Sequence, residues 1–304
     1  VHDALSKEDS YSFQLQPPWY RTIAAYISYA ILLGGLVFAV DRFQRRRLMK
    51  RARARTQRAL LEAENQRRIE ELEQARNLQL SMLPKKVPIV PGISIAAFMK
   101  TATEVGGDYY DFSVSNGELT GAIGDATGHG INAGMMVSIT KGLFVSEAQQ
   151  RSVLDFFKKS NSVIRQMQLK RIYMALSVFK IKNKMLTMSS AGMPPAYWYQ
   201  AANNTVEEIS PKGMPLGATN EFPYKCEQRE LEKNDILFFM SDGFPELFNQ
   251  QNKIIGYDAV PGILHKNANK EPQAIIDAFV SHIKSWAQGR ANDDDITFVV
   301  LKIQ

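Results

Sequence analysis

Residues 103–112, TEVGGDYYDF, place Asp108 directly after two glycines at the start of an expected strand. Glycine has no Cβ atom, so its backbone can approach a neighbour closely or adopt a positive φ angle. This arrangement suits a carboxylate that is directed at a crowded centre.

Other aspartates stand in the same kind of position. Asp125 ends the run GELTGAIGD, Asp242 ends DILFFMSD, and Asp293, Asp294 and Asp295 open DDDITFVVLKI. Taken singly, each is compatible with a turn or a helix cap, where aspartate is common. Several carboxylates that converge in one fold repel each other and are costly to desolvate unless cations lie between them.

Oxygen ligands without His or Cys select hard cations such as Mg²⁺ or Mn²⁺. Two such ions about 3.5–4 Å apart, bridged by one carboxylate, recur in phosphate ester hydrolysis, because they acidify a shared water and neutralise the phosphoryl oxygens. The sequence contains no G-x-x-x-x-G-K-[ST] or G-x-G-x-x-G phosphate loop.

The chain of 304 residues is 45% hydrophobic and can bury a sizeable core. Residues 93–304 predict an antiparallel α+β domain, because expected strands come in consecutive groups with the expected helices grouped between them. Strand patterns lie at 93–99, 119–125, 172–181, 184–192, 195–199, 224–231, 235–243 and 295–303, and helical patterns at about 131–147, 152–168, 257–265 and 272–286. The single cysteine, Cys226, is expected to be a half-buried strand residue and has no partner for an internal disulfide.

Six motifs together carry a family resemblance: EVGGDYYDF, GDATGHG, AGMPPAYWY, GMPLG, SDGFPE and DDDIT. Their order and rough spacing resemble the PPM-type (protein phosphatase 2C-like) serine/threonine phosphatases of the bacterial stage II sporulation protein E family, over about residues 76–304. The resemblance implies an antiparallel β-sandwich flanked by helices, with the phosphatase domain at 84–304. It also implies metal-dependent hydrolysis of phosphoserine or phosphothreonine on a protein.

Carried over to this sequence, the resemblance makes Asp125 the carboxylate that bridges two Mn²⁺ or Mg²⁺ ions. Asp108 and the backbone carbonyl of Ala126 are then expected to hold one ion, and Asp242 and Asp294 the other. Asp294 is chosen from the triple aspartate because it begins the Asp-Asp-x-Thr pattern that leads into the strand.

Four further polar residues near these motifs have open roles. Asp293 and Asp295 are either solvated or support the metal ligands. His129 could act as a general acid toward the leaving serine or threonine oxygen, but a structural role in the Gly-His-Gly turn is favoured. Asp111 is interpreted as a turn residue or a support for the ligands.

Two positions depart from the family pattern. Met193 stands where a histidine is usual, and Thr101 stands where a proline is common. Neither is a metal position, so altered packing or substrate fit is expected.

Residues 23–40, IAAYISYAILLGGLVFAV, carry no charge and would span ~27 Å as a helix, close to the thickness of a bilayer core. Trp19 and Tyr20 precede this stretch and arginines follow it, which favours a transmembrane helix at 20–41 over a buried core helix. A cleaved signal peptide would carry its positive charge before the apolar stretch. The positive-inside rule predicts a single-pass inner-membrane protein with a cytoplasmic phosphatase domain.

Residues 1–19 are expected to end an extracytoplasmic sensor domain. Tyr11, Phe13 and Leu15 alternate with polar residues, as in a half-buried strand. The stretch resembles the end of the triple-tyrosine domain that joins periplasmic propeller sensors to a membrane helix.

Residues 41–58 contain nine Arg or Lys and one Asp, a local charge of +8, so the rest of the chain carries −2 of the total of +6. The folded part is therefore not basic. A nucleic-acid surface would need basic residues spread over a folded face with interleaved aromatics, so neither nucleic-acid binding nor a nuclease is favoured.

Residues 42–83 predict a helical linker, because no Gly or Pro occurs between Arg42 and Met82. Spacings of three and four residues along it suggest a parallel two-stranded coiled coil and hence a homodimer. The seam consists of Leu61, Asn65, Arg68, Leu72, Ala75, Gln79 and Met82. Arg68 and Gln79 are poor seam residues, so a solvated single helix is a nearly equal alternative.

The sequence thus predicts a membrane-anchored, metal-dependent protein phosphatase in transmembrane signalling. The resemblance implies a phosphorylated cytoplasmic regulatory protein as substrate, often an anti-sigma-factor antagonist of the STAS type. The alternative is a catalytically weak scaffold or regulated-binding module that sits in membrane lipid and keeps the phosphatase fold.

Overall fold

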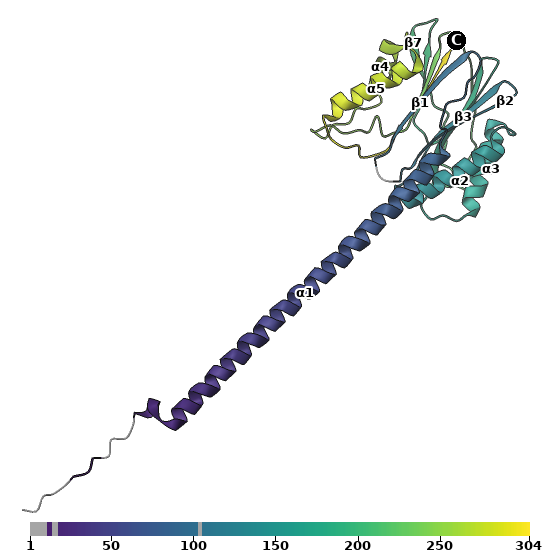
Figure 1. Ribbon diagram of the computed structural model, residues 1–304. Helices are drawn as coiled ribbons and strands as arrows, with labels where there is room; N and C mark the ends of the chain where they lie inside the picture. Colours follow the sequence, from purple (N-terminus) through teal and green to yellow (C-terminus); the bar gives the residue numbers. More distant parts are fainter. Residues whose placement is uncertain (1–10, 14–17, 103–104) are drawn as a thin grey trace, which may run out of the picture. The chain divides into compact units, whose positions relative to one another are not determined.

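The computed structural model describes residues 11–13, 18–102 and 105–304 (Figure 1). The chain divides after Arg68 into two compact units, and each is described by itself. The first unit contains the short helix η1 (Trp19–Arg21) and most of the helix α1 (Ile23–Met82). The second unit begins at Ile69 and contains the last part of α1 and all of the strands.

The helix α1 runs for 60 residues without interruption, so the expected transmembrane segment and the expected linker form one helix. Its apolar beginning has an 18-residue window with a mean hydropathy of 2.2, and nearly all of this window is exposed. By length and composition, the window could cross a bilayer. The strand expected around Tyr11 and Phe13 is not formed at residues 11–13, and Leu15 lies outside the described residues.

The second unit is built on two five-stranded sheets in which every pairing is antiparallel. The first sheet has the order β1 (Ile93–Lys100), β10 (Ile296–Ile303), β9 (Ile236–Met240), β6 (Ala196–Gln200), β7 (Thr205–Ile209). The second has the order β2 (Asp108–Ser115), β3 (Glu118–Ala126), β4 (Met174–Lys182), β5 (Met185–Ala191), β8 (Glu227–Glu230). Each expected strand is present. The strand β7 was not anticipated, because TVEEI is mostly polar and pairs only with the neighbouring β6.

Helices cover the outer faces of the two sheets (Figure 1). The helices α4 (Ala259–Asn267) and α5 (Pro272–Ala287) bury a core against the first sheet. The helices α2 (Ile131–Glu147) and α3 (Val153–Gln166) bury another against the second sheet. A third core lies between the sheets. The predicted α+β fold, a β-sandwich flanked by helices, is confirmed.

The core between the sheets depends on a glycine beneath an aromatic ring. Phe179 of β4 stacks on Phe239 of β9 with ring centroids 4.6 Å apart, which joins the two sheets. A Cβ atom added to Gly121 of β3 would lie 2.1 Å from Cζ of Phe179. The ring therefore occupies the space that a side chain at residue 121 would need.

We expect Gly121→Ala to lower the free energy of unfolding of the second unit by ~1–3 kcal/mol, because the new methyl group forces the Phe179 ring out of its packed position. Gly142→Ala on the exposed face of α2 is the matched control, since nothing lies within 4 Å of its added Cβ. This control should be neutral or stabilise by up to ~1 kcal/mol. Thermal unfolding of both variants, followed by near-ultraviolet circular dichroism, distinguishes them, and equal midpoints would contradict the expectation.

Candidate functional site

The two sheets bring the predicted aspartates to one end of the sandwich. Asp108 begins β2 and lies directly opposite Asp125 of β3 in the antiparallel register. Asp242 follows β9, and Asp294 and Asp295 precede β10, which is the strand paired with β9. Residues from four motifs thus meet where the ends of neighbouring strands come together.

Asp108 joins the two sheets through hydroxyl groups. Its Oδ2 accepts hydrogen bonds from Ser241 Oγ at 2.8 Å and from Thr297 Oγ1 at 2.5 Å. The backbone N–H of Thr297 in turn donates to Ser241 Oγ at 2.9 Å. Asp108, with only 3% of its surface exposed, is therefore fixed between strands of different sheets.

The two glycines before Asp108 leave room for two other carboxylates. A Cβ on Gly107 would lie 2.8 Å from Asp125 Oδ1 and 2.7 Å from the carbonyl oxygen of Ala126. A Cβ on Gly106 would lie 2.3 Å from Asp295 Oδ2. Side chains at these positions would displace the carboxylates, so the glycines are needed for close approach rather than for a turn.

A cavity of about 160 Å³ opens at this end of the sandwich. Its lining consists of Ala102, Asp125, Ala126, Gly128, His129, Asp293, Asp294 and Asp295. Asp125, Ala126 and Asp294 of the predicted metal set thus line one cavity. Asp108 is buried opposite Asp125, and Asp242 lies near enough to raise the pKa of Asp125.

The carboxylates repel one another strongly. Burial, then the negative charges of Asp242 and Asp294, raise the pKa of Asp125 to about 8. Burial and the charge of Asp294 raise the pKa of Asp242 to about 6. Burial, followed by the charge of Asp125, raises the pKa of Asp108 well above its usual value. A bound cation would relieve this repulsion and favour the ionised carboxylates.

The donor set fits a hard divalent cation, because it consists of carboxylate oxygens and the carbonyl oxygen of Ala126. Within the described parts of the chain, no group of three or more His, Cys, Asp or Glu side chains is already arranged to hold a metal ion. The carboxylates are gathered at one cavity and coupled electrostatically, but the predicted ligand geometry stays a prediction.

Sequence reasoning missed three residues that the fold brings to this site. Ser241 and Thr297 hold Asp108 and stand beside or close to predicted ligands in the motifs SDGFPE and DDDIT. Glu246 follows Asp242 by four residues, and its negative charge helps to raise the pKa of both Asp125 and Asp242. The carboxylate of Glu246 is visible in SDGFPE, but spacing alone could not show that its charge acts on Asp125 of another strand.

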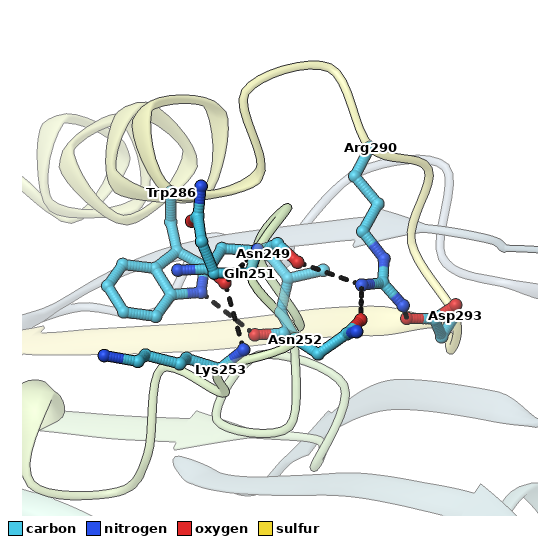
Figure 2. Close-up of polar contacts among 8 residues, drawn as sticks. Asn249, Gln251, Asn252, Lys253, Trp286, Arg290 and Asp293 are labelled. Atoms are coloured by element: carbon cyan, nitrogen blue, oxygen red, sulfur yellow. Dashed lines mark hydrogen bonds and ion pairs between the residues drawn. The ribbon is translucent and has the colours of Figure 1, made fainter.

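Asp293 is tied to a neighbouring turn, as Figure 2 shows. The Arg290 guanidinium lies 3.1 Å from Asp293 Oδ2 and also donates to the carbonyl oxygen of Asn249 at 2.9 Å and to Asn252 Oδ1 at 2.8 Å. Asp293 thus lines the cavity while forming an ion pair on its rim.

His129 and Asp111 have different surroundings. His129 lies between Gly128 and Gly130, whose φ angles are 85° and 76°, at the start of α2. It lines the cavity near Asp294. Burial raises the pKa of Asp294, and the backbone N–H of Asp295 and the neighbouring His129 act in the opposite direction. Asp111 is not in a turn: it lies within β2 and accepts hydrogen bonds from Tyr109 Oη at 2.8 Å and Lys141 Nζ at 2.6 Å. It therefore ties β2 to α2.

The two departures from the family pattern have structural places. Met193 is buried in the core between the sheets. Thr101 Oγ1 accepts a hydrogen bond from Arg76 Nη2 of α1 at 3.2 Å, an interaction that proline could not make. Cys226 is half-buried one residue before β8 and packs against the core beneath α3.

A sequence model described as stage II sporulation protein E (SpoIIE) matches residues 115–304, more than half of the chain. The chain belongs to this family. The matched region contains Asp125, Asp242 and Asp294, whereas Asp108 precedes it. Asp108 is joined to the site by its pairing opposite Asp125 and its bonds to Ser241 and Thr297.

A curated protein and several solved structures are similar to this chain. The chain is 26% identical over 237 residues to the phosphoserine phosphatase RsbU of Bacillus subtilis, and the alignment covers 76% of this chain and 70% of RsbU. The SiaA-PP2C domain of Pseudomonas aeruginosa aligns with a TM-score of 0.69 at 17% identity, covering 80% of this chain and 98% of that one. RsbX in complex with magnesium aligns with a TM-score of 0.55 at 17% identity, covering 72% and 99%. The predicted PP2C-like fold is confirmed.

Proposed function

We propose that this SpoIIE-family protein is a metal-dependent serine/threonine protein phosphatase. The observation that carries the proposal is the group of carboxylates at one cavity, in which Asp125 has its pKa raised to about 8 by burial and by its neighbours. Such a group is stable in its ionised form only with cations. Similarity to RsbU, a phosphoserine phosphatase, and to RsbX in complex with magnesium supports the same chemistry.

Each predicted ligand has a distinct role in this proposal. Asp125 would contact both of two Mn²⁺ or Mg²⁺ ions, Asp108 and the carbonyl oxygen of Ala126 would hold one, and Asp242 and Asp294 would hold the other. Bound in this way, the ions would supply an acidified water and neutralise the phosphoryl oxygens of phosphoserine or phosphothreonine. Ser241 and Thr297 fix the carboxylate of Asp108 from the opposite sheet.

Asp125→Asn should abolish Mn²⁺-dependent hydrolysis of p-nitrophenyl phosphate, because the loss of the bridging charge weakens the binding of both ions. The loss is expected to be at least ~10²-fold, measured at saturating Mn²⁺ with purified protein. Asp277→Asn on the exposed face of α5 removes the same charge away from the site and should keep full activity.

Full turnover by Asp125→Asn protein would contradict the ligand assignment. A wild-type protein that binds Mn²⁺ but hydrolyses neither p-nitrophenyl phosphate nor a phosphoprotein would instead favour the alternative, a scaffold that keeps the phosphatase fold.

We further propose that the beginning of α1 anchors the protein in the inner membrane, with the phosphatase domain in the cytoplasm. The apolar 18-residue window is mostly exposed in the structure, and the arginine-rich run follows it within the same helix. Exposed apolar surface of this length is stable in lipid and costly in water. The one-sided positive charge favours a cytoplasmic position for everything after it.

Cysteines placed at Ser12 and at Gln57 should react with an impermeant thiol reagent from opposite sides of the membrane. The native Cys226 is half-buried, so both variants are best made in a Cys226→Ser background to remove its signal. In intact spheroplasts only the cysteine at residue 12 should be labelled, and in inverted vesicles only that at residue 57. Labelling of both from the same side would exclude the proposed topology.

The substrate that we propose is a phosphorylated cytoplasmic regulatory protein, with an anti-sigma-factor antagonist of the STAS type as the specific candidate. The support is family membership and the similarity to RsbU. Comparison of the phosphoproteins of the wild-type and deletion strains should identify this substrate, because it accumulates in its phosphorylated form when the phosphatase is absent. Incubation with the purified protein should then remove its phosphate.

The last turns of α1 belong to the compact unit that contains the site. Gln79, expected in a helix–helix seam, is instead 7% exposed and bonded to Gly106: its Nε2 donates to the carbonyl oxygen at 2.7 Å and its Oε1 accepts from the N–H at 3.2 Å. The fold needs an amide here because Gly106 presents both a donor and an acceptor. We propose that an external signal reaches Asp108 through this contact, by rotation or changed pairing of a dimeric α1.

A rigid helix predicts a periodic response to insertions near Gln66. Insertions of three or four residues should rotate the helix before the insertion relative to the part after it and change phosphatase activity, whereas seven residues should largely restore it. The measurement is activity in membranes at matched expression. Identical activity of all three variants would exclude the rigid-helix mechanism while leaving the phosphatase assignment intact.

A further inference from the structure

The sequence left Asp295 without a definite role, and the structure gives it an unusual environment. It lies just before β10 with 4% of its surface exposed. Its Oδ1 accepts a hydrogen bond from the backbone N–H of Ala102 at 2.7 Å. Its Oδ2 accepts from the N–H of Gly107 at 2.7 Å and from that of Asp108 at 3.3 Å. Both carboxylate oxygens are therefore engaged by the backbone that leads into β2.

These bonds fix the backbone beside the metal-ligating residues. Asp108 projects from one of the bonded N–H groups, and Ser241 and Thr297 hold its carboxylate from the other side. The carbonyl oxygen of Gly107 accepts from the N–H of Ala126 at 2.9 Å. The backbone of Gly107 thus links Asp295 to both halves of one predicted ligand pair, Asp108 and Ala126.

We propose that Asp295 is a positioning residue for the metal centre. It holds the backbone of Gly107 and Asp108 so that the Asp108 carboxylate and the Ala126 carbonyl face a hard divalent cation. We assign it to positioning rather than to ligation because both of its oxygens accept hydrogen bonds from the backbone N–H groups that lead into β2. The inference rests on the metal centre of the proposed function and adds a residue to it.

Aspartate is needed here because the three N–H groups require two acceptor oxygens. Asparagine has nearly the same shape but only one acceptor, and in either orientation its NH₂ group would face a backbone N–H. Asp295→Asn therefore disrupts this backbone clamp, the hydrogen bonds from Ala102, Gly107 and Asp108, with little change in side-chain volume. Groups that orient metal ligands typically change metal affinity by about 10–100-fold when they are altered.

The chain offers two matched controls. Asp235 is a second buried backbone clamp, 2% exposed, that accepts from Trp198 Nε1 at 3.0 Å, Ala201 N at 2.8 Å and Glu232 N at 2.9 Å. It lies before β9, whereas the site lies after that strand, so Asp235→Asn tests the loss of a clamp without the metal centre. Asp277→Asn removes a negative charge from the exposed face of α5, away from the cavity lining.

The experiment is Mn²⁺ binding by isothermal titration calorimetry and electron paramagnetic resonance, with full-length protein in detergent, alongside thermal unfolding. For Asp295→Asn, the Kd for Mn²⁺ should rise by ~10–100-fold. Asp235→Asn should lower the unfolding midpoint to a similar extent but change the Kd by less than about threefold, and Asp277→Asn should also stay within about threefold. Wild-type Mn²⁺ affinity in Asp295→Asn protein, or an equal loss in either control, would overturn the proposal.

If Asp295→Asn does not fold, Asp295→Ser serves the same test, because the smaller side chain leaves room for water to bond the freed N–H groups. Its Kd should rise to a similar extent, and an unchanged Kd would again overturn the proposal. Binding is read without catalysis, so the two proposals fail separately. A wild-type protein that binds Mn²⁺ without hydrolysing phosphate esters counts against the phosphatase and leaves the role of Asp295 measurable.

Discussion

Repulsion among buried carboxylates is the constraint on which the site depends. Four aspartates from both sheets meet at the site: Asp108, Asp125, Asp242 and Asp294. Burial, together with the negative charges of neighbouring carboxylates, raises the pKa of each of them. Packing of the sandwich has to hold these groups together against that repulsion. The stack of Phe179 on Phe239 and the hydroxyl bonds to Asp108 supply direct contacts between the sheets.

The backbone before β2 connects this site to the rest of the unit. Gly106 is bonded by Gln79 of α1, and Gly107 and Asp108 are bonded by Asp295 before β10. Two consecutive glycines are therefore contacted from two sides by side chains of distant segments. A shift of either partner would move the backbone of Asp108, and this is the route that we propose from α1 to the predicted metal centre.

Several features of the site could be predicted from the sequence because they depend on local pattern. The aspartates at strand ends indicated a shared centre, and Asp125 and Asp294 line one cavity; the strand runs predicted the α+β class. Other features depend on distant contacts and carry no local signal. Gln79 fits a heptad seam by spacing but bonds Gly106, and Asp111 resembles a turn residue but links β2 to α2. Glu246 influences the pKa of Asp125 only because the fold brings the segment after β9 near the end of β3.

The sequence by itself determined which residue types were available: apolar periodicity for two sheets, carboxylates at strand ends, and an uncharged helix followed by arginines. These are properties of neighbouring residues, and hydrophobic burial and backbone propensity act on them directly. Asp293, Asp294 and Asp295 all line the cavity, and only the tertiary structure decided that Asp295 is the one whose two oxygens both accept from the backbone that leads into β2. Asp294 and Asp295 are chemically identical and adjacent, but Asp294 accepts from the N–H of its neighbour Asp295, whereas Asp295 accepts from the distant N–H groups of Ala102 and Gly107. Contacts between segments this far apart in the sequence form only when the chain folds.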